Sequence, residues 1–180
     1  MKKIFVISGS SGVGKGTVIE GFLKRNPEFS LSISCTTRPM RPGEVDGANY
    51  YFLSRSEFEQ AVKNGEFLEW AEFAGNLYGT RRKNIRENTI LEIDTQGALQ
   101  VKAKIPDAVL IFICPPSLEE LEARLRGRGT EDEETIQKRL DFVKNELELA
   151  KQFDYQIVND SVENAISRLQ EVICLAAKQS

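Results

Sequence analysis

Continuous apolar runs alternate with amphipathic segments along most of this chain. Strands are expected from these runs at 4–7, 89–94, 108–113 and 155–158. Helices are expected at 16–25, from the end of the strand at 89–94 to about residue 104, from Ser117 onward, at 133–151 and at 162–177. Short apolar strands that alternate with helices are typical of a parallel sheet covered by helices on both faces. The pattern therefore predicts an α/β fold with three layers.

Two serines mark expected helix starts. A serine followed three residues later by a glutamate is the signature of a capping box. Ser56 with Glu59 predicts such a start for a helix over 58–64, and Ser117 with Glu120 predicts another.

The segment between the first two core strands has a different character. The alternation at 29–34 predicts a second strand, and residues 35–49 have the prolines and glycines of a loop. Further short strands are expected at 50–53, 67–73 and 76–78. We interpret this segment as a small β-rich excursion inserted into the α/β core.

Composition narrows the function classes. A chain of 180 residues suits one well-buried domain. The formal net charge of −3 argues against a dedicated nucleic-acid binder, which usually has a broad basic surplus. The sequence has no histidine, so a histidine zinc site and a histidine proton relay are excluded.

The cysteine usage and the hydropathy of the chain indicate the cellular compartment in which the protein works. Cys35, Cys114 and Cys174 are odd in number and widely spaced, so we expect free thiols in a reducing compartment and no metal cluster. No apolar segment approaches the ~20 residues of a membrane span, and no signal peptide precedes the first strand. We expect a cytoplasmic protein with neither a membrane nor a nucleic acid as partner.

A glycine-rich stretch follows the first strand and opens the first helix. It reads Gly9-Ser10-Ser11-Gly12-Val13-Gly14-Lys15-Gly16-Thr17. This context is that of a phosphate-binding P-loop, in which backbone N–H groups and the helix N-terminus surround an anion. Lys15 would reach the β- and γ-phosphates of a nucleotide. Because residue 16 is glycine, we expect the Mg²⁺-binding hydroxyl to come from Thr17. The alternative is a strand-to-helix turn that is glycine-rich without binding a ligand.

Charged residues recur in three further places. Arg38 and Arg41 lie three apart in the proline-containing loop, where their planar guanidinium groups suit a phosphate. Glu92 and Asp94 are two apart at the end of a core strand, so both side chains are expected to face the same side. Ligands bind at this end of the strands in open α/β sheets. The third place is the arginine-glycine segment at 124–130.

Taken together, these stretches resemble guanylate kinases over nearly the whole chain. The resemblance rests on the P-loop, SCTTRPMRPGE at 34–44, LEIDTQG at 91–97 and RLRGRGT at 124–130, with Glu69-Trp70 and Tyr78-Gly79-Thr80 between them. One departure is the short segment at 81–89, where the family usually has a longer helix and a glycine turn.

The resemblance implies a fold, a reaction and a division of the chain. The fold is that of P-loop NTPases, and the reaction transfers the γ-phosphoryl group of ATP to GMP with Mg²⁺ as cofactor. The implied core covers 1–33, 89–120 and 141–180, the GMP-binding region 34–88 and the lid 121–140. We expect a monomer or a weak homo-oligomer.

The resemblance also implies roles for individual residues. The acceptor phosphate would be held by Arg38, Arg41, Tyr50 and Tyr78, and the guanine base by Ser34, Glu69, Thr80 and Asp94. Besides the P-loop, ATP would be held by Arg124, Arg128, Arg139 and Asn159, and Glu92 would bind Mg²⁺ through water. Lys15, Arg41, Arg124, Arg128 and Arg139 would be catalytic.

The chemistry of this reaction agrees with the composition. The second pKa of a phosphate monoester is about 6, so the acceptor is already a dianionic nucleophile at neutral pH. Phosphoryl transfer then needs positioning and charge neutralisation, and no histidine base. Two alternatives stay open, namely a P-loop kinase for another phosphorylated substrate and a non-catalytic binding domain of the same fold. An ordinary ion pair with Asp132 or Glu133 is the alternative for Arg139.

Overall fold

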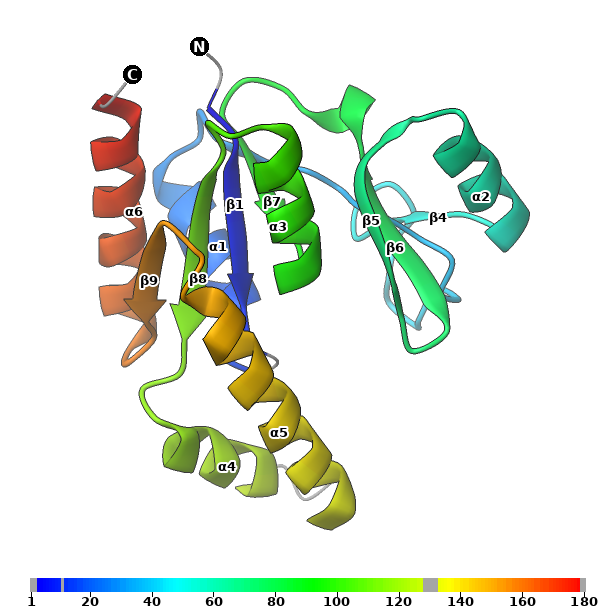
Figure 1. The fold of residues 1–180 in the computed structure, drawn as a ribbon. Coiled ribbons are helices and arrows are strands. Elements are labelled where there is room, and N and C mark those ends of the chain that lie inside the picture. The colour runs from blue at the N-terminus through cyan, green and yellow to red at the C-terminus, as the bar shows by residue number, and fades with distance from the viewer. Residues whose placement is uncertain (1–2, 11, 128–132, 179–180) are drawn as a thin grey trace.

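A five-stranded parallel sheet forms the centre of the computed structural model, which describes residues 3–10, 12–127 and 133–178 (Figure 1). The strand order is β2-β7-β1-β8-β9. These strands are β1 (Phe5–Gly9), β2 (Ser30–Leu31), β7 (Thr89–Glu92), β8 (Val109–Cys114) and β9 (Tyr155–Val158). The central strands β1 and β8 are buried throughout, which explains their continuous apolar runs.

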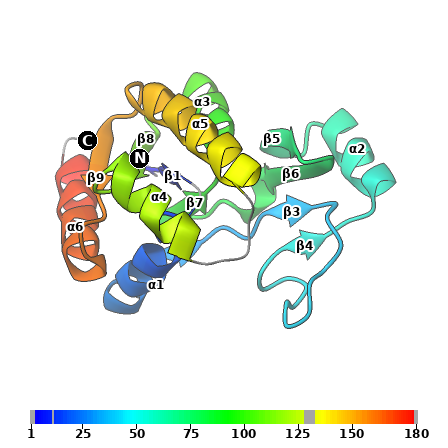
Figure 2. The same cartoon turned by 90° about the horizontal axis from the view of Figure 1, so that it is seen from below.

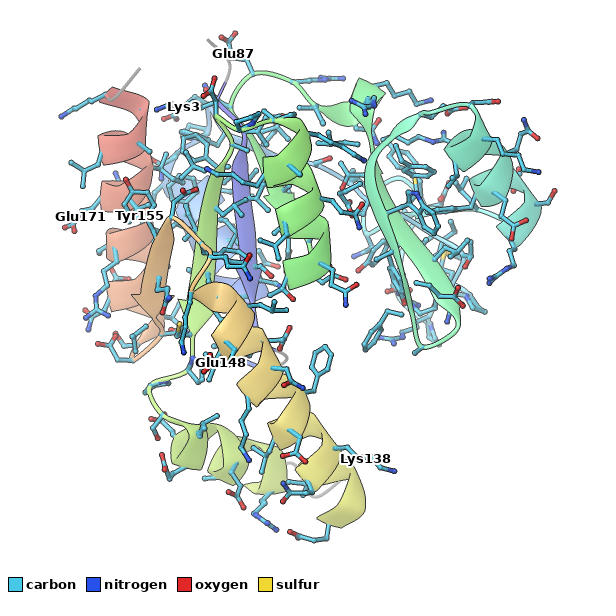
Figure 3. The ribbon with its side chains drawn as sticks, in the orientation of Figure 1. Lys3, Glu87, Lys138, Glu148, Tyr155 and Glu171 are labelled. Carbon is cyan, nitrogen blue, oxygen red and sulfur yellow. The ribbon has the colours of Figure 1, made fainter. Side chains whose placement is uncertain are left out.

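Helices cover both faces of this sheet (Figure 2). On one face α1 (Lys15–Arg25) and α6 (Val162–Lys178) share a cluster of buried side chains with β1 and β8. On the other face α3 (Thr95–Lys104) and the end of α5 (Glu133–Ala150) pack on a second cluster. The polar faces of the helices lie outside, as Glu171 of α6 and Lys138 of α5 show (Figure 3). The predicted three-layer α/β fold with a parallel sheet is confirmed.

A second sheet lies beside the core, at the right in Figure 1. Its strand order is β4-β3-β6-β5. Its elements are β3 (Cys35–Thr36), β4 (Tyr51–Phe52), β5 (Phe67–Phe73) and β6 (Asn76–Arg81), with α2 (Arg55–Lys63) packed on it. The predicted β-rich excursion is therefore a sheet with its own small apolar cluster. The 3₁₀ helix η1 (Arg82–Asn84) follows it, and the short segment at 81–89 leads from there into β7.

Two local predictions for this region are wrong. The single strand expected at 29–34 is replaced by β2 in the central sheet and β3 in the second sheet, because the chain changes sheets between them. The capping box of α2 starts at Ser54. Its hydroxyl accepts a hydrogen bond from the Glu57 backbone, and the Glu57 carboxylate accepts one from the Ser54 backbone at 2.7 Å. Two overlapping Ser-x-x-Glu patterns exist here, and the end of β4 selects the earlier one.

The helical pair α4 (Leu118–Gly127) and α5 extends beyond the carboxyl ends of the strands (Figure 1). The predicted start of α4 is confirmed, because the Ser117 hydroxyl accepts a hydrogen bond from the Glu120 backbone at 3.1 Å. Cys35 and Cys114 are buried, Cys174 is exposed, and all three are free thiols. Within the described part of the chain, none of the helices has the length and apolar character of a membrane span.

Candidate active site

The glycine-rich loop has the backbone that its sequence predicts. Gly12 and Gly14 have φ angles of 81° and 87°, in the left-handed region that favours glycine. Val13 between them is fully buried and anchors the loop in the core. Lys15 starts α1, so the free N–H groups of the first helical turn face the loop. The structure describes this loop except for Ser11, which lies outside the described residues.

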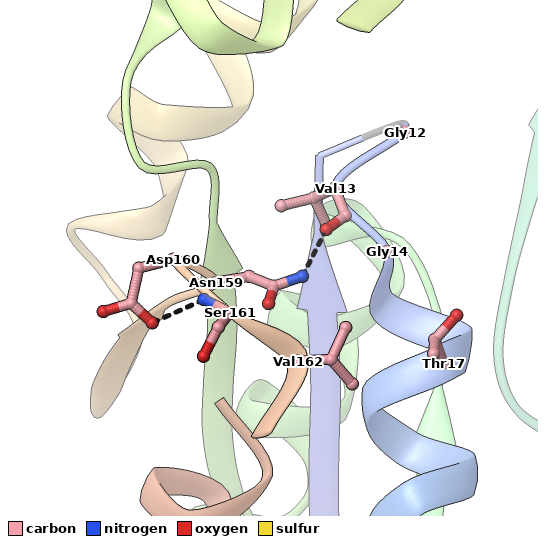
Figure 4. A pocket seen from close by; sticks show the side chains of 8 residues that line it. All are labelled: Gly12, Val13, Gly14, Thr17, Asn159, Asp160, Ser161 and Val162. Atoms are coloured by element: carbon pink, nitrogen blue, oxygen red, sulfur yellow. Dashed lines mark hydrogen bonds between the residues drawn. The ribbon is translucent and has the colours of Figure 1, made fainter. Parts of the chain in front are cut away.

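A cavity of about 310 Å³ opens beside this loop (Figure 4). It is lined by Gly12, Val13, Gly14, Thr17, Asn159, Asp160, Ser161 and Val162. The Asn159 side-chain amide donates a hydrogen bond to the Val13 carbonyl at 2.7 Å. Its Oδ1 atom is buried without a hydrogen-bond partner. The Asn159 hydrogen bond thereby fixes the loop after β9 against the P-loop, and the Asn159 Oδ1 atom remains available as an acceptor.

Lys15 and Glu92 meet at the carboxyl ends of neighbouring strands. Ile7 of β1 is in register with Glu92 of β7, and Lys15 follows β1 after one loop. The Lys15 Nζ atom lies 4.0 Å from the Glu92 Oε1 atom, and both side chains are partly exposed. The two residues proposed to bind Mg²⁺ have different neighbours, because Thr17 lines the cavity and Glu92 lies beside Lys15.

Asp94 is not in a strand, contrary to the prediction. Strand β7 ends at Glu92, and Asp94 is the N-cap of α3. Its carboxylate accepts a hydrogen bond from the Gly97 backbone at 2.6 Å. The acidic N-cap satisfies a free N–H group and complements the helix dipole, so the helix start competes successfully with continuation of the strand.

Glu69 is buried in strand β5, which packs against α3. It is 3% exposed, and Thr80 lies opposite it in the β5–β6 pair. Burial raises the pKa of Glu69 to about 7, and the nearby Asp94 charge adds to the rise while Thr80 opposes it. The Glu69 Oε1 and Thr80 Oγ1 atoms are buried without a hydrogen-bond partner. A buried carboxylate and a buried hydroxyl thus lie next to each other in the second sheet.

Gly97 completes this small pocket. A Cβ atom at Gly97 would lie 2.7 Å from Oε2 of Glu69 and 3.2 Å from Oδ1 of Asp94. A side chain at this position would displace the Glu69 carboxylate and press against that of Asp94. Ser34 directly precedes Cys35, which pairs with Gly79 next to Thr80, so the antiparallel register places Ser34 opposite Thr80.

A second polar cluster lies on the same sheet, around Arg38. Its guanidinium group donates two hydrogen bonds to the Glu44 carboxylate, at 3.0 and 2.7 Å. It also lies 5.5 Å from the centre of the Tyr50 ring, whose centre is 6.2 Å from that of Tyr78. Arg41 is exposed, and its backbone N–H donates to Glu44 at 2.7 Å.

Glu44 is a functional candidate that sequence reasoning missed. It belongs to the loop at 34–44 that carries part of the family resemblance, but the sequence analysis assigns it no role. The structure makes it the residue that orients Arg38 and turns the loop around Arg41. The arginine pair keeps the Glu44 carboxyl pKa below its usual range, first through the Arg38 hydrogen bond. A glutamate three to six residues after paired arginines was the available signal.

The arginines predicted for the lid cannot be placed from the structure. Arg128 lies outside the described residues, as do the side chains of Arg124 and Arg139. Arg126, by contrast, pairs with Glu122 at 2.8 Å and with Glu133. Glu133 is also one of the two acids with which Arg139 would form an ordinary ion pair in the alternative stated in the sequence analysis.

These features define a class of protein. A P-loop at the carboxyl edge of a parallel sheet, beside a second sheet that has a polar cluster around Arg38 and a buried carboxylate at Glu69, is the architecture of a nucleotide-dependent phosphotransferase.

The particular family follows from comparison with known proteins. The guanylate kinase family model matches residues 1–176. A guanylate kinase of Nostoc sp. is 51% identical over 174 residues, which are 93% of this chain and 87% of the relative. A guanylate kinase of Thermobifida fusca is 50% identical over 99% of this chain and 94% of the relative. The crystal structure of guanylate kinase from Anaplasma phagocytophilum matches with a TM-score of 0.78 at 35% identity, covering 96% of this chain and 84% of that one. The chain belongs to the guanylate kinase family.

This result confirms the family, the P-loop kinase fold and the enzyme class expected from the sequence, a nucleoside monophosphate kinase. The family match covers residues 1–176, which include the short segment at 81–89. Opposite Glu69, Thr80 keeps its place in the β5–β6 register despite that short segment.

Proposed function

We propose that this chain transfers the γ-phosphoryl group of ATP to GMP, giving ADP and GDP. The observation that carries the proposal is the buried carboxylate of Glu69, which lies opposite the buried Thr80 and near the exposed carboxylate of Asp94. Guanine presents an N1–H and an N2 amine on one edge, and both are donors. Adenine lacks this pair, so it would leave buried acceptors without partners, which costs free energy. Support comes from Glu69 Oε1, a buried acceptor without a partner.

The acceptor phosphate is proposed to bind at the Arg38 cluster. Arg38 and Arg41 supply bidentate positive charge, and Tyr50 and Tyr78 supply neutral donors. Because Glu44 already orients Arg38, little conformational freedom is lost when the phosphate arrives. GMP would thus lie across residues 34–88, its base toward α3 and its phosphate toward Lys15.

ATP is proposed to bind at the P-loop cavity. The backbone N–H groups of residues 9–17 would surround its phosphates, and Lys15 would neutralise charge on the transferring group. The buried Asn159 Oδ1 atom would accept a hydrogen bond on the adenine side. Arg124, Arg128 and Arg139 are proposed to close over the phosphates from the lid at 121–140.

Magnesium fits the donor set of this site. The Thr17 hydroxyl and Glu92 carboxylate are oxygen donors, which Mg²⁺ prefers, and Mg²⁺ takes few protein ligands when phosphates and water supply the rest. When bound, it would neutralise charge on the β- and γ-phosphates. We propose Thr17 as a direct ligand and Glu92 as a partner of its water shell. Lys15 near Glu92 keeps that carboxylate close to the phosphate path.

The proposed setting is purine nucleotide metabolism in the cytoplasm, with a monomer or weak homo-oligomer as the active species. Light scattering on the purified protein tests the oligomeric state.

The activity is tested with a coupled ADP-release assay that offers ATP–Mg²⁺ and each nucleoside monophosphate in turn. The expected result is a kcat/KM for GMP at least about a thousandfold above that for AMP, because a hydrogen-bonding site rejects an analogue lacking its donors by this order or more. Equal values for GMP and AMP would exclude the guanine assignment. ADP release with none of the monophosphates would exclude the kinase function.

A further inference from the structure

The outer edge of strand β5 is covered by side chains of α3. Because β5 is an edge strand of the second sheet, its outer backbone groups have no neighbouring strand. The Gln100 side-chain amide takes that place at Trp70, accepting from its N–H at 3.4 Å and donating to its carbonyl at 3.0 Å. The Lys104 Nζ atom donates to the Leu68 carbonyl at 2.6 Å. Two side chains of one helix thus hold two residues of the strand.

Glu69 lies between these two held residues. The β5–β6 register shifts between Phe67 and Glu69, so Leu68 is the extra residue of a bulge. Bulges beside active sites re-aim the neighbouring side chain. Leu68 is 1% exposed and packs in the apolar cluster beneath α3, while Glu69 faces the polar pocket. The direction of the Glu69 carboxylate therefore depends on how the backbone at 68–70 sits on α3.

The contacts come from one face of α3. Asp94, Gly97, Gln100 and Lys104 follow at spacings of three, three and four, which places them on one stripe of a helix. Asp94 begins the helix, Gly97 leaves room for the Glu69 carboxylate, and Gln100 and Lys104 hold the strand. A single helix thus sets the positions of both acids of the pocket.

We propose that Gln100 and Lys104 are positioning residues for base selection, fixing the Leu68–Trp70 backbone on α3 so that Glu69 meets the guanine edge. This inference rests on the proposed function, since it assumes that Glu69 binds the base. Neither residue needs to touch the nucleotide. Electrostatics supports the arrangement, because the Lys104 charge favours the ionised form of Glu69, whereas Asp94 disfavours it.

The test compares four variants by steady-state kinetics with GMP, AMP and ATP. Gln100→Leu and Lys104→Met each remove the contact with β5 at similar side-chain volume, and Lys104→Arg restores a donor. Lys102→Met is the matched control. Lys102 also lies on α3 and donates to a backbone carbonyl, that of Ala108, at 2.7 Å, but its charged partner is Asp154, which precedes β9.

The expected result is a change in the KM for GMP that is much larger than any change in the KM for ATP. Gln100→Leu and Lys104→Met should raise the GMP KM about tenfold and narrow the preference for GMP over AMP, with the ATP KM changed less than about twofold. Lys104→Arg should recover most of the loss. Lys102→Met should lower the melting temperature without moving the GMP KM. Equal changes in the GMP and ATP KM values, or the same GMP effect in Lys102→Met, would overturn the inference.

A double-mutant cycle with Glu69→Gln decides whether the effect passes through Glu69. If it does, Lys104→Met should add less than about twofold to the GMP KM in the Glu69→Gln background, because coupled sites are not additive. Full additivity would overturn the positioning role. A wild-type enzyme that does not prefer GMP would instead refute the proposed function, so the two failures are distinguishable.

Discussion

The Lys15 amino group and the Glu92 carboxylate lie 4.0 Å apart where the ends of two parallel strands meet. The residues are 77 positions apart in the sequence, and the β1–β7 register brings them together. Without nucleotide, the acid offers the lysine a partly exposed partner, and the transferring phosphate would compete for the same lysine. The pair thus joins the two halves of the proposed site.

Lys15→Ala should lower kcat by at least about a hundredfold, because it removes the positive charge closest to the transferring phosphoryl group. The fold should persist, since the Lys15 side chain is partly exposed. Turnover and melting temperature are measured together. Lys24→Ala on the exposed end of the same helix is the control and should keep normal turnover. A Lys15→Ala enzyme with near-normal kcat would contradict the P-loop role.

Arg41→Met should raise the GMP KM and lower kcat while leaving the ATP KM nearly unchanged. Its guanidinium group is exposed, so its removal should hardly affect stability. A bidentate, charge-assisted phosphate contact contributes roughly 2–3 kcal/mol, so kcat/KM for GMP should fall about thirtyfold or more.

Arg86→Met, on the exposed segment before β7, is the matched control. An Arg41→Met effect confined to ATP would refute the acceptor-phosphate assignment.

Asp94 has two roles that substitution can separate. Asparagine still caps a helix, whereas alanine does not, so Asp94→Ala should lose about 1 kcal/mol of stability and Asp94→Asn much less. Both should weaken the preference for GMP over AMP, since both remove the carboxylate acceptor. Chemical denaturation gives the stability and paired kinetics give the selectivity. Unchanged selectivity in Asp94→Asn would leave Asp94 with the capping role alone.

Glu69→Gln should stabilise the free protein at alkaline pH while reducing guanine selectivity. Burial raises the pKa of Glu69 from its ordinary value of 4.5 to about 7. Between these values the folded protein binds more protons than the unfolded chain, so stability falls as pH rises. Asp94 adds to the raised pKa and Lys104 opposes it. Above about pH 7 the penalty is complete, and glutamine, which cannot ionise, avoids it.

The difference in unfolding free energy between Glu69→Gln and wild type should therefore grow from near zero at about pH 4.5 to roughly 1–3 kcal/mol at about pH 8. Urea denaturation across this range measures it. A constant difference would contradict a buried, titrating Glu69. Thr89→Val, also buried but uncharged, should show no such pH dependence.

Local patterns in the sequence predicted the central fold well. The fully buried strands β1 and β8 and the amphipathic helices α1, α5 and α6 occur where expected, because burial on both faces or on one stripe leaves a clear signal in the sequence. The strand, glycine-rich turn and helix start of the P-loop also occur where the sequence predicts them, with Gly12 and Gly14 in the left-handed region. Short polar strands carry a weaker signal, so the change of sheets between β2 and β3 was not predicted.

The sequence by itself determined which chemical groups are present and where the P-loop lies, because strand, glycine turn and helix are contiguous in the chain. It also named Glu69 and Asp94, through resemblance. Only the tertiary structure decided that Glu69 is buried, that Gly97 makes room for it, and that Asp94 caps a helix. The first two properties depend on the packing of β5 against α3, which are about thirty positions apart in the sequence, and long-range packing of this kind leaves no periodic trace in the sequence. The third is a local contact between Asp94 and Gly97.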